Sequence, residues 1–374
     1  MRSKNIMSNN SLKWCSRCVT MSTRPRITFD KNGVCNACLW SIKKKKIDWD
    51  SRVNKLKVIL EKEKKKNKSF DCLVPVSGGK DGSYVSYKLK NEFGVNPLCV
   101  TITPHLELDI GKENLSNFVK KGYDHISVNP NYEIVKKMNK LGFINLGFPY
   151  FGWLLSINTI PIRIAEKFDI NLIFYGEDGE VEYGGSSETE KDPFYDFEYQ
   201  KNIYLENGYD KILNEIDKKK YNLFWFSFPS KKSPINLTHW SYFENWDPYR
   251  NYLVAKNKCG LVEIEDTNSG TFTNFAQNDQ GLYALHTYLM YLKFGFGRAN
   301  QDAAIEIRRG SMDREQAINL IKLYDGAYPY DYIETYLDYY EMSKKEFDKI
   351  LDKFANKKLF EKENGLWKPK FKII

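Results

Sequence analysis

Between residues 70 and 175, short apolar runs alternate with amphipathic helical patterns, and this alternation most constrains the fold of the chain. The apolar runs predict strands at 70–76, 97–103, 125–128 and 170–175. The segments between and around them predict helices at 83–93, 112–121, 132–141 and 153–168. This order is typical of an α/β fold with a doubly wound parallel sheet. Ligands bind beyond the carboxyl ends of such strands, so we expect the site in the loops after Val76, Thr103 and Tyr175.

The first of these loops carries the motif Ser77-Gly78-Gly79-Lys80-Asp81-Gly82-Ser83. Its glycines let the backbone approach a phosphate closely, and the N–H groups at the start of the following helix form an anion-binding nest. The spacing matches neither the Walker A motif nor the G-x-G-x-x-G dinucleotide fingerprint. A plain glycine-rich turn is the alternative interpretation. The position between a strand and a helix favours a phosphate-binding loop.

Four of the seven cysteines form two Cys-x2-Cys pairs with 16 residues between them: Cys15 with Cys18, and Cys35 with Cys38. Two thiolate pairs at this spacing can close a tetrahedral zinc site, so we predict an N-terminal zinc ribbon. An iron–sulfur cluster and four inert thiols are the alternatives. Protein ligands would fill all four positions and leave none for substrate, which predicts a structural zinc. The other three thiols are interpreted as small buried side chains: Cys72, Cys99 and Cys259.

Lysine and arginine number 57 against 48 aspartate and glutamate, a surplus of nine that lies largely in the basic stretches 43–46 and 61–68. Such runs are usually solvated surface, so a nucleic-acid partner is not required, although the charge favours an anionic substrate such as ATP. The sequence has no run of 18 apolar residues, and its first 13 residues are polar. We therefore expect a cytoplasmic protein without a membrane span.

Four carboxylates follow the strand predicted at 170–175, namely Glu177, Asp178, Glu180 and Glu182. A solvated acidic turn is one interpretation of this loop. Its position at the carboxyl end of a strand favours contacts to a substrate, to ammonia or to a metal instead.

A second candidate segment places Arg298 after two glycines, at the entry to a helix predicted at 301–309. Asp302 and Glu306 lie one turn apart on that helix and repel by about 0.2–0.5 kcal/mol unless a cation neutralises them. Arg298 or Arg309 can do so. A structural ion-pair cluster is the alternative to the ligand-facing loop that the glycines favour.

The rest of the chain is predicted to be helical at 280–294, 313–323 and 343–356, and Ser343 with Glu346 has the form of a capping box. Residues 190–260 show no clear period and predict an irregular insertion that covers the site. We divide the chain into a zinc ribbon (1–48), an ATP-binding domain (49–190), and an insertion with a helical substrate or partner region (191–374).

Together these segments are similar, over nearly the whole chain, to the N-acetyl sugar amidotransferases of the PP-loop ATP pyrophosphatase superfamily. The loop resembles the superfamily signature S-G-G-x-D-S, except that Gly82 stands where serine is usual and Ser83 follows it. The segments Trp246–Tyr249 and Lys293–Arg298 resemble that amidotransferase family specifically. The resemblance implies a doubly wound sheet of PP-loop type.

The resemblance also implies roles for individual residues. The residues expected to bind ATP are Ser77, Gly78, Gly79, Lys80, Asp81, Ser83 and Thr101, with Asp81 also holding Mg²⁺. The residues expected to act in catalysis are Lys80, Asp81, Glu177 and Glu182. The residues expected to contact the acceptor sugar are Glu177, Tyr183, Arg298 and Asp302, with Arg298 binding an acidic group.

The implied reaction converts an acetamido group to an acetamidino group in flagellin glycan or lipopolysaccharide biosynthesis. ATP would adenylate the amide oxygen, and ammonia from a separate glutaminase subunit would displace AMP. A PP-loop enzyme that thiolates tRNA is the alternative function. An inactive ATP-binding scaffold, which Gly82 would explain, is a third possibility.

Overall fold

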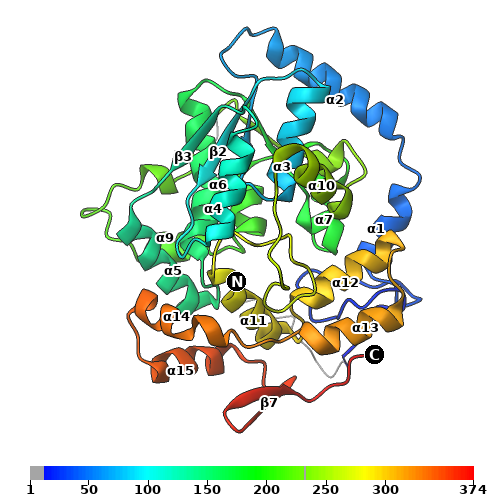
Figure 1. The fold of residues 1–374 in the computed structure, drawn as a ribbon, viewed down its shortest axis with the longest axis vertical. Helices are drawn as coiled ribbons and strands as arrows, with labels where there is room; N and C mark the ends of the chain where they lie inside the picture. Colours follow the sequence, from blue (N-terminus) through cyan, green and yellow to red (C-terminus); the bar gives the residue numbers. More distant parts are fainter. Residues whose placement is uncertain (1–11, 231–232) are drawn as a thin grey trace.

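The computed structural model describes residues 12–230 and 233–374. Its centre is a six-stranded sheet with the order β3-β2-β1-β4-β6-β5 (Figure 1). The strands in that order are His125–Val128, Pro97–Ile102, Cys72–Pro75, Leu172–Tyr175, Asn236–His239 and Phe194–Tyr195. Neighbouring strands are parallel except for β5, which pairs antiparallel with β6 at the edge. The predicted α/β fold with a largely parallel sheet is confirmed.

Alternate residues of the central strands enter two different cores, which makes the sheet doubly wound. Leu73 and Ile173 face the first core with α6 and α11, whereas Val74 and Phe174 face the second. The second core is closed by residues of α2, α3 and α4. These helices span Phe151–Lys167 (α6), Leu282–Phe294 (α11), Trp49–Lys64 (α2), Lys80–Tyr87 (α3) and Asp109–Val119 (α4). A strand buried on both faces reads as a continuous apolar run, as it does here.

Two strands lie inside the segment that the sequence predicts to be irregular. β6 pairs in parallel with β4 along its whole length, so that Ile173 lies beside Leu237, and β5 pairs with β6. The prediction of an irregular segment is wrong at these strands. β6 has a single aliphatic residue among its four, and only its pairing with β4 identifies it as a strand.

Several helices begin and end at other residues than predicted, and some were not predicted. α3 begins at Lys80, three residues early, and continues as a π-helical turn over Lys88–Glu92. α5 (Tyr132–Leu146) begins where predicted and ends five residues later. The helices that were not predicted include α1 (Asn36–Lys44), α7 (Gly179–Tyr183), α9 (Tyr209–Leu213) and α10 (Pro248–Val254).

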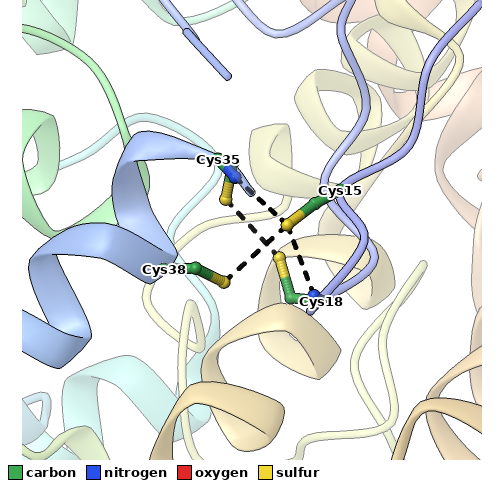
Figure 2. Close-up of side chains that lie close together, drawn as sticks. All are labelled: Cys15, Cys18, Cys35 and Cys38. Atoms are coloured by element: carbon green, nitrogen blue, oxygen red, sulfur yellow. Dashed lines mark hydrogen bonds between the residues drawn. The ribbon is translucent and has the colours of Figure 1, made fainter. Parts of the chain in front are cut away.

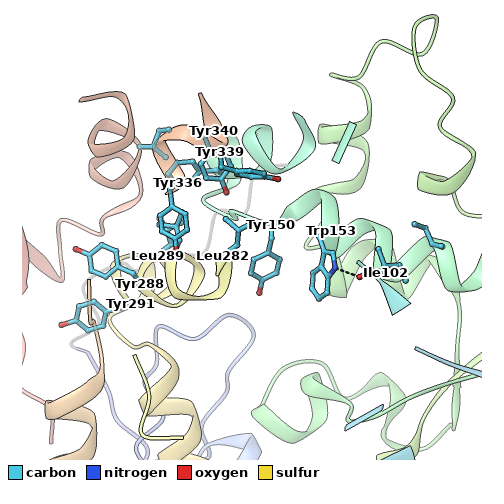
Figure 3. Close-up of a cluster of buried hydrophobic side chains, with 14 of the residues drawn as sticks. Ile102, Tyr150, Trp153, Leu282, Tyr288, Leu289, Tyr291, Tyr336, Tyr339 and Tyr340 are labelled. Atoms are coloured by element: carbon cyan, nitrogen blue, oxygen red, sulfur yellow. Dashed lines mark hydrogen bonds between the residues drawn. The ribbon is translucent and has the colours of Figure 1, made fainter. Parts of the chain in front are cut away.

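The last third of the chain is helical, and its final two helices pack against α11 at the end of the molecule opposite α2 (Figure 1). The elements are α12 (Arg298–Arg309), α13 (Arg314–Tyr324), α14 (Ile333–Tyr340), α15 (Lys344–Phe354) and the hairpin β7–β8 (Phe360–Glu363, Leu366–Pro369). The capping box of Ser343 and Glu346 is confirmed. Figure 3 shows the tyrosine-rich core between these helices and the Trp153 Nε1–H that donates to Ile102 O at 3.1 Å. Within the described ranges, no helix has both the length and the apolar character that crossing a bilayer requires.

Candidate active site and metal cluster

A cavity of about 350 Å³ lies beyond the carboxyl ends of β1 and β4. The predicted site residues that line it are Ser77, Gly79, Lys80, Asp81, Glu177 and Arg298. They come from the loop after β1, the loop after β4 and the start of α12. The structure therefore brings together residues that lie more than 200 positions apart in the chain.

The helix α3 points an uncapped N-terminus at this cavity. Gly79 is its N-cap and has no side chain that could accept hydrogen bonds from the first-turn N–H groups. Such N–H groups carry partial positive charge and suit an anion. Gly78 has a φ of 78°, and a Cβ there would lie 2.5 Å from the Asn114 carbonyl carbon of α4. Only glycine fits this turn, so the first glycine of the motif has a steric reason.

Gly82 also has a steric reason for departing from the usual serine. A Cβ at this position would lie 2.7 Å from Pro75 O and 3.0 Å from Val76 Cα. The α3 backbone therefore approaches β1 too closely to admit a side chain. The glycine is a packing requirement of this helix–strand contact and does not indicate an inactive loop.

We expect Gly82→Ser to lower the melting temperature, because overpacking at a rigid backbone contact typically costs about 1–3 kcal/mol. Gly79→Ala is the matched control, since its Cβ would meet only Ser77 Oγ, at 3.4 Å. Thermal unfolding followed by circular dichroism measures both. Equal melting temperatures for Gly82→Ser and the wild type would contradict the steric explanation.

Ser83 and Thr101 do not line the cavity, although both were assigned to ATP. The Ser83 side chain is fully buried, and its Oγ has no partner among the described residues. Thr101 donates to Val76 O at 2.7 Å and lies 2.8 Å from His125 Nε2. Thr101 thus fixes the backbone at Val76, directly after β1, and so supports the glycine-containing loop that follows.

Lys80 and Asp81 form an ion pair on the cavity wall. Lys80 Nζ lies 2.6 Å from Asp81 Oδ2, and Lys80 is buried. Asp81 Oδ1 is also buried, and it has no hydrogen-bond partner within the described part of the chain. A free carboxylate oxygen beside an anion-binding helix terminus fits a hard cation such as Mg²⁺, which prefers oxygen ligands.

Glu177 is the member of the acidic loop that faces the cavity. Its Oε2 accepts hydrogen bonds from the Tyr183 hydroxyl and from Trp246 Nε1, the latter at 3.1 Å. Burial raises the pKa of Glu177, and the negative charge of Asp81 adds to that rise. Glu177 also lines a second cavity of about 180 Å³, together with Tyr183 and Trp246. A carboxyl with a raised pKa between two cavities is suited to accept and release protons.

The other three carboxylates of this loop bind protein groups. Asp178 caps α7, and Glu180 pairs with Arg26 at 2.6 Å. Glu182 accepts from Trp40 Nε1 at 2.9 Å and pairs with Lys44 at 2.8 Å. Glu182 and Tyr183 line the second cavity and not the first. The acidic loop therefore mainly contacts the N-terminal segment, and of its four carboxylates only Glu177 lines the cavity near Asp81.

On α12, both candidate cations neutralise a carboxylate. Arg298 Nε lies 2.8 Å from Asp302 Oδ1, and Arg309 Nη1 lies 2.5 Å from Glu306 Oε2. Asp302 also accepts from Thr271 Oγ1 at 2.6 Å, and it lies outside the cavity. Burial lowers the pKa of Arg298, but its pairing with Asp302 outweighs this and raises the pKa overall. Asp302 therefore anchors Arg298, whose guanidinium reaches the cavity.

The sequence interpretation missed one wall of the cavity. The residues of this wall are Phe275, Ala276, Gln277, Asn278, Asp279 and Tyr283. They precede and begin α11 in a segment without apolar periodicity. The polar run from Gln277 to Gln280 is the one local signal that could have indicated a ligand-facing loop.

The four N-terminal cysteines converge on one point (Figure 2). Cys15 Sγ lies 3.9 Å from Cys38 Sγ, Cys18 Sγ lies 3.7 Å from Cys35 Sγ, and all four sulfurs lie within 4.8 Å of one another. A tetrahedral zinc with 2.3 Å bonds requires sulfurs about 3.8 Å apart. The buried cluster could therefore hold one zinc ion. An iron–sulfur cluster needs several metal and sulfide ions between the thiolates, and this spacing leaves no room for them.

The cluster packs against the C-terminal helices. Ala303 and Ala304 of α12 and Ala317 of α13 share its core. Arg308 Nη1 lies 3.9 Å from Cys18 Sγ, and Arg314 Nη1 donates to Cys15 O at 2.8 Å. The same helix α12 thus reaches the cavity at its first residue and the cysteines near its last. In the second cysteine pair, Cys35 is the N-cap of α1 and Cys38 lies in the first turn of that helix.

Comparison with known proteins finds similarities to a family, to a curated protein and to a solved structure. Residues 269–372, less than a third of the chain, match a family described as LPS biosynthesis protein WbpG-like, C-terminal domain. A stretch of 107 residues is 31% identical to an uncharacterized protein of Methanocaldococcus jannaschii, covering 28% of this chain and 38% of that protein. The chain thus spans well under two thirds of the length of that relative. A solved structure titled as a predicted subunit of tRNA methyltransferase from the same organism has 15% identity and a TM-score of 0.27, over 63% of this chain and 91% of that one.

Proposed function

We propose that this chain is an ATP-dependent amidotransferase of PP-loop type that converts an acetamido group of an N-acetylated sugar into an acetamidino group. The observation that carries the proposal is the cavity in which the uncapped start of α3, Lys80, Asp81, Glu177 and Arg298 meet. The similarity of residues 269–372 to an LPS biosynthesis family supports a sugar as the acceptor. Pseudaminic acid or a diacetamido sugar nucleotide, in flagellin glycan or lipopolysaccharide synthesis, is the expected substrate.

The loop after β1 would hold the triphosphate. The first-turn N–H groups of α3 and the Lys80 ammonium would stabilise the charge that develops on the departing pyrophosphate. Asp81 would hold Mg²⁺ through its unpartnered Oδ1. The ion would supply charge neutralisation at the phosphates. Binding of phosphate by Lys80 and of Mg²⁺ by Asp81 would account for a buried lysine beside a carboxylate.

The acetamide oxygen is a poor leaving group, which is why the reaction needs ATP. Attack of this oxygen on the α-phosphorus forms an O–P bond and expels pyrophosphate with the electron pair of the broken bond. Ammonia then adds to the imidate carbon, the C–O bond breaks, AMP leaves, and the added nitrogen loses one proton. Glu177 would take that proton, because burial raises its pKa and so favours proton uptake.

The cysteines argue against sulfur transfer, the alternative function. Cys72, Cys99 and Cys259 are all buried. Burial raises the pKa of Cys99 to about 12 and that of Cys259 to about 11, and it raises the pKa of Cys72 well above the ordinary value of a thiol. A nucleophilic cysteine needs an exposed thiol with a lowered pKa. The same argument leaves this chain without a glutaminase nucleophile, so we propose that a separate glutaminase subunit supplies ammonia.

The test incubates the purified chain with ATP, Mg²⁺ and CMP- or UDP-linked diacetamido sugars, first with glutamine and then with ammonium at raised pH. We expect no product with glutamine, and with ammonium a product lighter by the difference between O and NH in mass spectrometry. Product from glutamine by this chain alone would refute the separate glutaminase. AMP release that responds to tRNA and to no acetamido sugar would favour the thiolation alternative.

A further inference from the structure

The cavity wall formed by residues 275–279 contains one hydrogen-bond acceptor without a partner in the described chain, Asn278 Oδ1. Asn278 is 7% exposed and lines the cavity. Its Nδ2 donates to Asn274 O at 3.0 Å, which fixes the amide orientation and leaves Oδ1 without a partner in the part of the chain that the structure describes. The neighbouring Asp279 adds a carboxyl to the same wall, and burial raises its pKa to about 6. At neutral pH the residues that line this wall therefore include one unpartnered amide oxygen and one carboxylate.

The wall is held rigidly against the segment that follows β2. Leu108 N donates to Asp279 O at 3.0 Å, and Gly281 N donates to Leu106 O at 2.9 Å. Gly111 of α4 lets the two backbones meet, because a Cβ there would lie 2.6 Å from Asp279 Cα. A subsite fixed in this way recognises a ligand without first having to become ordered.

Acceptor atoms select for a ligand that donates. A buried oxygen without a partner costs free energy that a ligand N–H or O–H recovers. A secondary amide is planar and trans, so its N–H and its C=O point to opposite sides. An acetamido group whose N–H is held at Asn278 or Asp279 therefore turns its carbonyl oxygen away from this wall. The cationic groups Lys80 and Arg298 line the same cavity and are suited to the anionic parts of the reactants.

We propose that Asn278 and Asp279 form the acceptor subsite, which binds the N-acetylated sugar through its amide N–H and hydroxyl groups and directs the acetamido oxygen to the nucleotide. This inference rests on the proposed function and deepens it. As the carbonyl oxygen bonds to the α-phosphorus and pyrophosphate departs, positive charge develops on the amide nitrogen. The Asp279 carboxylate stabilises that charge through the N–H hydrogen bond.

The experiment compares Asn278→Leu and Asp279→Asn with the wild type, using a UDP-linked diacetamido sugar, ATP, Mg²⁺ and ammonium. We expect the KM for the sugar to rise about tenfold or more in both variants, the effect of losing one buried hydrogen bond to a charged or polar group. In Asp279→Asn we also expect kcat to fall, because the variant loses the carboxylate that stabilises the developing positive charge. The KM for ATP should stay unchanged. Asp266→Asn is the matched control, because Asp266 is exposed in the same segment and does not line the cavity. Circular dichroism and melting temperature confirm folding.

A second substrate separates recognition from general damage. An analogue with an N-methylated acetamido group lacks the N–H, so the wild type should use it with a kcat/KM about tenfold or more below that of the parent sugar. Asn278→Leu and Asp279→Asn should lose this discrimination. If the wild type makes product but both variants keep its sugar KM and its discrimination against the N-methylated analogue, the subsite is overturned. A wild type that makes no product from any acetamido sugar with ammonium would overturn the proposed function itself, and the subsite with it.

Discussion

Asp81→Asn is expected to lower the rate of pyrophosphate and AMP release about 100- to 1,000-fold, the typical effect of removing one group that stabilises charge in a transition state. Asp81 lines the cavity, its Oδ2 lies 2.6 Å from Lys80 Nζ, and its buried Oδ1 is free for a cation. Asparagine keeps the volume but loses the charge. Because the buried Lys80 loses its paired charge, the melting temperature should fall as well, so circular dichroism must show that the variant is folded. Coupled pyrophosphate detection measures the rate.

The matched control is Asp109→Asn. Asp109 also lies in the first turn of a helix and pairs with a lysine, Lys112, at 3.0 Å, but its side chain is 99% exposed and lies outside the cavity. We expect this variant to keep the wild-type rate. Wild-type turnover by a folded Asp81→Asn variant would show that the loop after β1 does not bind the phosphates.

Cys18→Ser is expected to remove most of the bound zinc and to lower the melting temperature by about 5 °C, the shift that a loss of about 4 kcal/mol gives in a chain of this size. Cys18 is one of four converging sulfurs, and a serine hydroxyl is a poor substitute for a thiolate ligand. Metal content by elemental analysis and thermal unfolding check this expectation.

The structure adds a reason why activity should fall together with the fold. The N-terminal segment holds the acidic loop through Arg26 with Glu180 at 2.6 Å and through Lys44 with Glu182 at 2.8 Å. Loss of zinc should therefore loosen the loop that positions Glu177. Cys259→Ser is the control, because Cys259 is equally buried but lies outside the cluster and should leave the zinc in place. A zinc-free variant that is fully folded yet inactive would contradict a purely structural zinc.

Three features could be predicted from the sequence because their physical causes are local. The apolar runs around Leu73 and Ile173 identify central strands, since a strand buried on both faces must be apolar throughout. The spacing of the cysteine pairs predicts the cluster, because ligand geometry fixes it. The glycines of the loop after β1 indicate a tight turn, and Gly78 has a φ of 78° there, while the approach of this backbone to a phosphate stays a prediction.

The tertiary structure alone decided the remaining features, because their causes lie far away in the chain. β6 is a strand through its pairing with β4, although Leu237 is its one aliphatic residue. Of four adjacent carboxylates, Glu177 faces the cavity while Glu180 and Glu182 face partners from the N-terminal segment. The polar wall at Asn278 reaches the cavity because the chain after β2 anchors it. Local sequence specifies which residues can bury, bend or ligate, but burial and charge pairing depend on neighbours that only the folded chain brings together.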